Sequence, residues 1–87
     1  MALFPIYGVF EGDFVPHLVA IDTDNNMKDV ADAVARHSVG RRVARDPKAT
    51  GYEASIHGQS IDLNRSFGDV MTELNIVPLD FVTVRFA

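Results

Sequence analysis

The side chains that could do chemistry are few and widely spaced. The three histidines, His17, His37 and His57, stand 20 residues apart. A zinc site on a single helix or strand needs closely spaced ligands, such as two histidines at i and i+4. The histidines are therefore expected in surface or structural contacts, not in a metal site or an acid–base pair.

The carboxylates do not follow the pattern of an iron site. A diiron centre in a helical bundle uses Glu-x-x-His, because a spacing of three points both ligands from one helix face. No glutamate here has histidine three residues on; the pairs are Glu11 and Phe14, Glu53 and Ile56, Glu73 and Ile76. Asp29 and Asp32 have helical spacing, but acids in a first turn mainly complement the helix dipole. The chain itself is not expected to hold iron.

The sequence also lacks the residue patterns of other common catalytic and cofactor sites. There is no cysteine, which excludes disulfides, thiol catalysis and cysteine-ligated zinc or iron–sulfur clusters. No Ser-His-Asp grouping and no glycine-rich phosphate loop is recognisable. We do not expect an enzyme that acts alone.

The length and charge limit the organisation and the partners. At 87 residues the chain predicts a single domain over 1–87. A net charge of −4 is against nucleic-acid binding, which favours a basic surface. There is no basic, apolar leader and no apolar run near the roughly 18 residues of a membrane span, so a cytoplasmic protein without membrane contact is expected.

The first half predicts a hairpin whose second strand is apolar on both faces. Residues 3–10 and 14–21 are apolar runs separated by the turn signal Gly12-Asp13. In the second run Leu18 and Ala20 alternate with Val19 and Ile21, the pattern of a strand covered on both sides. The chain has one main helix to cover one face, so another chain is expected to cover the other.

The remaining pattern predicts an α+β domain. A helix starts near Met27, and its apolar stripe is Met27, Val30, Ala31, Val34 and Ser38. A strand over 52–56, an extended piece over 60–63, a short helix capped by Ser66 and a closing strand over 79–86 follow. Hairpin, helix, strands, short helix and final strand is the order of the β-grasp, or ubiquitin-like, fold, a mixed sheet wrapped on one main helix.

Residues 4–44 resemble a known family. The matching residues are Phe4-Pro5, Phe10-Glu11, Asp13-Phe14, Leu18-Val19, Asp22, Met27, Val30-Ala31, Val34-Ala35, His37 and Arg41-Arg42-Val43-Ala44. They are similar to the small γ subunit of toluene-4-monooxygenase-type hydroxylases, the bacterial multicomponent diiron monooxygenases. From Arg45 onward only the pattern of elements matches.

The resemblance implies a non-catalytic role. It implies a hydroxylase of two α, two β and two γ chains, whose α chain carries the diiron centre that oxidises a hydrocarbon. O2, an NADH reductase, a Rieske ferredoxin and an effector protein serve that reaction. The γ chain would dock on and stabilise the larger subunits, and its candidate interface residues are Phe4, Pro5, Phe14, His37, Arg41 and Arg42. For the arginines, favourable placement beyond a helix C-terminus is an equal explanation.

Two other hypotheses for the function stay open. One is a free-standing ubiquitin-like binding module, modifier or sulfur carrier; the other is the small effector protein of such a monooxygenase. Modifiers and sulfur carriers use a C-terminal Gly-Gly, whereas this sequence ends in Arg85-Phe86-Ala87. The matched residues favour the γ subunit over the effector.

Overall fold

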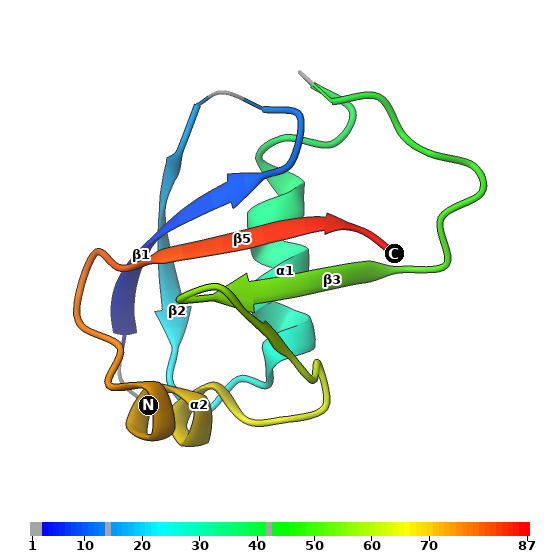
Figure 1. The fold of residues 1–87 in the computed structure, drawn as a ribbon. Helices are drawn as coiled ribbons and strands as arrows, with labels where there is room; N and C mark the ends of the chain where they lie inside the picture. Colours follow the sequence, from blue (N-terminus) through cyan, green and yellow to red (C-terminus); the bar gives the residue numbers. More distant parts are fainter. Residues whose placement is uncertain (1–2, 14, 42) are drawn as a thin grey trace.

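The computed structural model describes residues 3–13, 15–41 and 43–87 (Figure 1). The elements in chain order are β1 (Leu3–Phe10), β2 (His17–Asp22), α1 (Met27–Arg36), β3 (Tyr52–Ile56), β4 (Gln59–Ile61), α2 (Phe67–Leu74) and β5 (Phe81–Phe86).

The strands form one mixed sheet in the order β2-β1-β5-β3-β4. β1 pairs antiparallel with β2 and parallel with β5, while β3 pairs antiparallel with both β4 and β5. The last strand therefore lies in the middle of the sheet, between the two hairpins. This arrangement confirms the predicted α+β, β-grasp fold.

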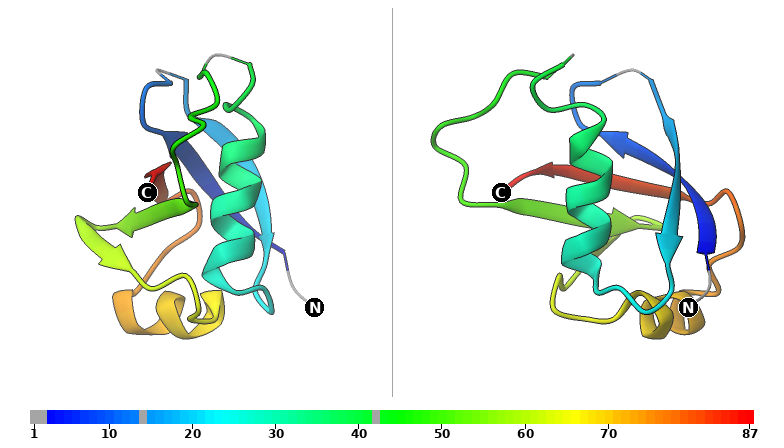
Figure 2. Two further views of the ribbon diagram at one scale, coloured as in Figure 1. Left: turned by 90° about the vertical axis from the view of Figure 1, so that its right-hand side faces the viewer. Right: turned by 180° about the vertical axis from the view of Figure 1, so that it is seen from behind.

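Helix α1 packs across one face of the sheet, as the view from behind shows (Figure 2). The predicted stripe is correct, because all its members are buried: Met27, Val30, Ala31, Val34 and Ser38. The four apolar members meet the inward side chains of the strands, which are Ile6, Phe10, Val19, Ile21, Ala54, Ile56, Ile61, Val82 and Val84. Burial of these side chains against one helix is the main stabilisation available to so short a chain.

Backbone hydrogen bonds join the N-terminal end of each helix to the segment that precedes the other. Asn26 caps α1 in a capping box with Asp29. The next donors bond across to the segment before α2, with Met27 N–H on the Arg65 carbonyl at 2.8 Å and Lys28 N–H on the Leu63 carbonyl at 3.0 Å. In return Phe67 N–H donates to the Asn25 carbonyl at 2.8 Å. The first backbone N–H groups of a helix have no partner within the helix. Here they bond to the neighbouring segment and so fix α2 against α1.

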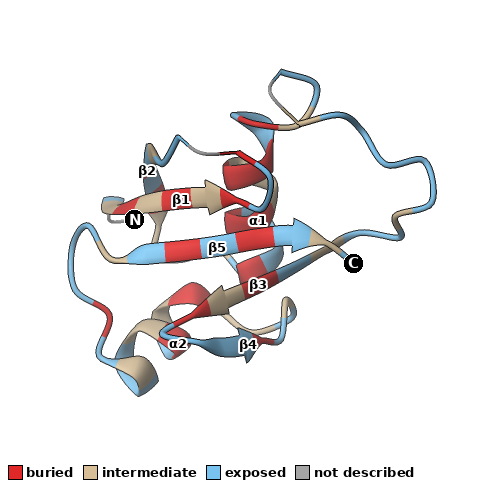
Figure 3. Cartoon of the chain, turned by 45° about the horizontal axis from the view of Figure 1, so that its top comes forward, coloured by how far each residue is buried: buried red, intermediate tan, exposed pale blue. Residues whose placement is uncertain are grey.

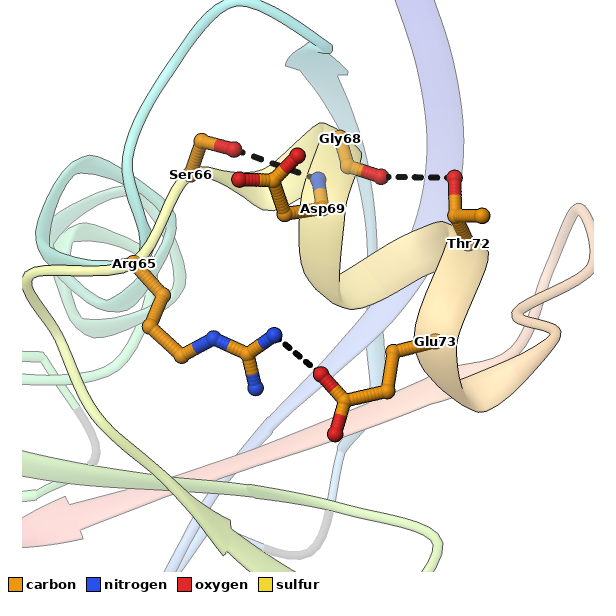
Figure 4. Close-up of polar contacts among 6 residues, drawn as sticks. All are labelled: Arg65, Ser66, Gly68, Asp69, Thr72 and Glu73. Atoms are coloured by element: carbon orange, nitrogen blue, oxygen red, sulfur yellow. Dashed lines mark hydrogen bonds and ion pairs between the residues drawn. The ribbon is translucent and has the colours of Figure 1, made fainter.

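Local polar contacts complete α2 (Figure 4). The Ser66 hydroxyl accepts from the Asp69 N–H at 3.1 Å, as the predicted cap should. The Thr72 hydroxyl donates to the Gly68 carbonyl, and Arg65 forms an ion pair with Glu73. These contacts join residues close together in the chain and account for a stable short helix.

The second strand begins later than the sequence predicts. Instead of running over 14–21, it starts at His17. Glu11 and Gly12 form a turn, and Asp13 follows it: its N–H donates to the Phe10 carbonyl at 2.9 Å, and its carboxylate accepts from the Val15 N–H at 3.0 Å. Pro16 follows and has no N–H for the ladder.

Two other strands differ at their ends from the predicted ranges. β4 covers Gln59–Ile61 rather than 60–63, because His57 and Gly58, both with positive φ, form a two-residue hairpin turn that pairs Gln59 with Ile56. β5 begins at Phe81 rather than at residue 79, because Leu79 has φ 70° and belongs to the preceding turn.

Gly8 sets how closely β1 approaches α1. A Cβ at this position would lie 2.7 Å from Val34 Cγ2. Gly8→Ala is therefore expected to lower the free energy of unfolding by about 1–3 kcal/mol, measured by urea denaturation. In the double variant with Val34→Ala the loss should be smaller than the sum of the two single losses. Additive losses would show that this contact does not set the spacing.

Candidate docking surface

The sheet face opposite α1 carries an apolar half. Strand residues alternate between faces, so the neighbours of the buried side chains point away from α1. Figure 3 shows this alternation as bands of buried and exposed residues along β5. Neither α1 nor α2 covers this face (Figure 2). Its apolar side chains are Leu3, Pro5, Tyr7, Val9, Leu18, Ala20 and Phe81, called here the apolar outer patch.

The centre of the patch is a row across three strands. Leu18 of β2 pairs with Tyr7 of β1, which pairs in turn with Phe81 of β5. The rings of Tyr7 and Phe81 lie 5.4 Å apart. Leu18 is 62% exposed and Phe81 is 53% exposed. Large apolar side chains gathered in this way on a surface are typical of a protein-binding site.

The other half of the same face is polar. Arg85 of β5 donates to the Glu53 carboxylate of β3 from Nε at 2.8 Å and from Nη2 at 2.6 Å. This contact raises the pKa of the Arg85 guanidinium. With Ser60 and Thr83 these residues line a shallow hollow of about 280 Å³. The half formed by β3, β4 and the end of β5 therefore suits contact with water.

The structure places the predicted residues Phe4 and Pro5 on opposite faces of β1. Phe4 turns inward and packs edge-on against Phe67, with the ring centroids 5.8 Å apart. Pro5 is half-buried and belongs to the apolar outer patch. Phe4 therefore contributes to the core, and its role at an interface stays a prediction.

His37 and Arg41 lie elsewhere, beyond the end of α1. Both are exposed, and His37 caps the helix. Phe4 and Pro5 are near the start of β1, whereas the C-terminus of α1 lies beside the β1–β2 turn, at the other end of that strand (Figure 1). The structure thus does not bring these predicted residues into one surface. The remaining two, Phe14 and Arg42, lie outside the described residues.

A polar cluster beside the β1–β2 turn was not predicted. The Ser38 hydroxyl donates to the Asp13 carboxylate at 2.7 Å, and both residues are buried. The same carboxylate lies 3.5 Å from His17 Nε2, and the rings of His17 and His37 stack at 5.3 Å. A spacing of 20 residues in the sequence gave no sign of this contact, which depends on β2 and α1 being neighbours. The contacts tie the turn to the end of α1.

A groove lies between the loop of residues 45–51 and the end of the sheet. Its volume is about 600 Å³, and its apolar lining includes Val39, Pro47, Tyr52 and Phe86. Phe86 packs against Phe10 at 5.0 Å between ring centroids, so the groove floor is continuous with the core. The loop of residues 45–51 arches away from the sheet (Figure 1).

His57 joins the β3–β4 turn to the loop before β5. His57 Nε2 lies 2.8 Å from the Asp80 carboxylate, which also accepts from Val77 N–H at 3.3 Å. The hydrogen bond with His57 holds the pKa of Asp80 below its usual 3.8. Asp80 directly precedes Phe81, so this contact fixes the loop at the border of the apolar outer patch.

Within the ranges that the structure describes, no three His, Asp or Glu side chains gather in a way that could hold a metal ion. In the same ranges, neither helix is long and apolar enough to cross a membrane. The surface feature with the clearest chemical character is the apolar outer patch.

The sequence matches a family model over residues 3–86, that of toluene-4-monooxygenase system protein B (TmoB). The chain belongs to the TmoB family. It is 49% identical over 86 residues to the alkene monooxygenase oxygenase component subunit gamma of Xanthobacter autotrophicus, covering 99% of this chain and 98% of that protein. The toluene-4-monooxygenase hydroxylase component subunit gamma of Ectopseudomonas mendocina is 48% identical over 44 residues, about half of each chain. The family resemblance found in the sequence is thereby confirmed.

Solved structures agree with this family and with the fold. A chain of a toluene 4-monooxygenase complex with the inhibitor 4-bromobenzoate superposes with a TM-score of 0.81 at 30% identity, covering 99% of this chain and all of that one. Ubiquitin of Caldiarchaeum subterraneum gives a TM-score of 0.68 at 11% identity, covering 99% and 95%. The second likeness shows the ubiquitin-like fold alone.

The His57–Asp80 contact predicts a pH dependence of stability. Because the pKa of Asp80 is lowered in the folded state, the ionised carboxylate stabilises the folded protein above about pH 3.8. This stabilisation is lost as the pH falls through the pKa of the folded state. The urea midpoint of the natural protein should therefore fall more steeply below pH 4 than that of Asp80→Asn. Asp32→Asn, which removes a carboxylate from α1, is the control and should keep the steep fall. Parallel curves for Asp80→Asn and the natural protein would contradict the assignment.

Proposed function

We propose that this TmoB-family chain is the non-catalytic γ subunit of a multicomponent hydrocarbon monooxygenase. The observation that carries the proposal is its 49% identity, over nearly the whole of both chains, to a γ subunit of an alkene monooxygenase oxygenase component. The likeness to a chain in a toluene 4-monooxygenase complex supports the same role. The whole chain, 1–87, serves as one domain in a cytoplasmic assembly.

The proposed assembly contains two α, two β and two γ chains. The diiron centre and the substrate cavity belong to the α subunit, and the chemistry there is the oxidation of a hydrocarbon by O2. Electrons come from NADH through a reductase and a Rieske ferredoxin, and an effector protein acts on the hydroxylase. The contribution of the γ chain is to bind and stabilise the larger subunits.

The residues of this chain suit such a role. Glu53 is paired to Arg85 and Glu73 to Arg65, so these two carboxylates form surface ion pairs. The buried Asp13–Ser38 contact is used to hold a turn. The exposed apolar side chains of the sheet offer the binding surface that a subunit needs.

The proposal is tested by co-expressing the chain with its α and β subunits, with the affinity tag on α. We expect the three chains to purify together in equal numbers and to run as one species in native mass spectrometry. If the chain is absent from the tagged complex and is recovered as a free 9.6 kDa protein, the proposal is wrong. Free recovery together with a need for the chain in turnover would identify an effector instead.

A further inference from the structure

The sheet face opposite α1 is the part of the subunit most suited to burial in the assembly. Resting on the function proposed above, we propose that the apolar outer patch, centred on the row Leu18–Tyr7–Phe81, is the surface that packs against the large α subunit of the hydroxylase.

The first support is the exposure of the patch. Leu18, Phe81 and Leu3 are 62%, 53% and 70% exposed, although each belongs to a strand of the sheet. Next to the patch, Leu79 is also exposed and its N–H donates to the Pro5 carbonyl at 2.9 Å. Removing such side chains from water favours association.

The second support is the contrast within a single sheet face. The row Leu18–Tyr7–Phe81 crosses β2, β1 and β5, and an equivalent row, Ser60–Ser55–Thr83, crosses β4, β3 and β5. The first row is apolar, whereas the second is polar and lies beside the exposed Arg85–Glu53 ion pair. Each row crosses three strands on the same face of one sheet, and the two rows differ in the chemistry of their side chains. An interface core is apolar and depleted in charge, and only the first row is apolar and lies away from the Arg85–Glu53 ion pair.

The third support is the charge around the patch, which favours a different chain over a second copy. Asp22 ends β2, and Asp80 precedes Phe81. In a symmetric pair of copies the same surface meets itself, so these carboxylates would face one another. A partner with an apolar centre and Lys or Arg at its rim would complement both the apolar outer patch and the carboxylates around it. The proposal therefore assigns these properties to the docking site on α.

The test uses competition for places in the complex. The α and β subunits, with the tag on α, are co-expressed with equal amounts of the natural γ chain and a mass-distinguishable variant. Leu18→Lys with Phe81→Lys places two charges in the patch. Ser60→Lys with Thr83→Lys adds the same charge in the equivalent positions of the polar half and is the matched control.

The variant in the patch should be depleted in the purified complex by about tenfold or more relative to the natural chain, as expected when central interface residues are disrupted. The control should be incorporated within about twofold of the natural chain. All four positions are exposed, so the substitutions should leave the core intact. Urea midpoints of the isolated variants check that each is folded. Equal incorporation of the two double variants would overturn the assignment of the surface.

Photo-crosslinking identifies the occupant even where a charged variant fails to fold. A benzophenone amino acid replaces Leu18 in one complex and Thr83 in another, and the attached peptide is identified by mass spectrometry. We expect position 18 to crosslink to α and position 83 to give no crosslink. A crosslink from position 18 to β or to a second γ chain would overturn the choice of partner, and no crosslink from it would overturn the surface. If the natural chain never enters the complex, the proposed function fails as well, so the two failures are distinguishable.

Discussion

One helix has to cover a sheet that has two faces, and the other features of the chain follow from this constraint. Helix α1 covers the face formed by side chains such as Ile6, Val19 and Val82 (Figure 2). Gly8 allows the helix to lie close, since a Cβ there would meet Val34. The opposite face is left with Tyr7, Leu18 and Phe81 at its surface. Among the described residues, neither helix covers these side chains (Figure 2).

Much of the fold could be predicted from the sequence, because local signals are strong in this chain. The stripe from Met27 to Val34 has helical spacing, Ser66 is a clear cap, and alternation marks the closing strand. Strand ends were less predictable. The turn at Asp13 depends on a side-chain hydrogen bond, and Leu79 adopts a positive φ that its residue type does not announce.

The candidate surface was only partly predictable, because it depends on which strands become neighbours. The doubly apolar second strand indicated an uncovered face, and the structure shows Leu18 exposed on it. Its continuation through Tyr7 to Phe81 required the parallel pairing of β1 with β5, which joins residues far apart in the chain. The same is true of the stacked His17 and His37. The resemblance alone could not separate Phe4, which faces the core, from Pro5, which faces outward.

The central claim is that this subunit contributes a docking surface while the chemistry takes place on another chain. A cryo-electron microscopy structure of the purified oxygenase component would test it most directly. We expect the outer face of β1 and β2 to be buried against the α subunit, with the Glu53–Arg85 pair in solvent and the iron bound by residues of α. A structure with Leu18 and Phe81 in solvent and the polar half buried would contradict the assigned surface. Iron ligated by this chain would contradict the non-catalytic role.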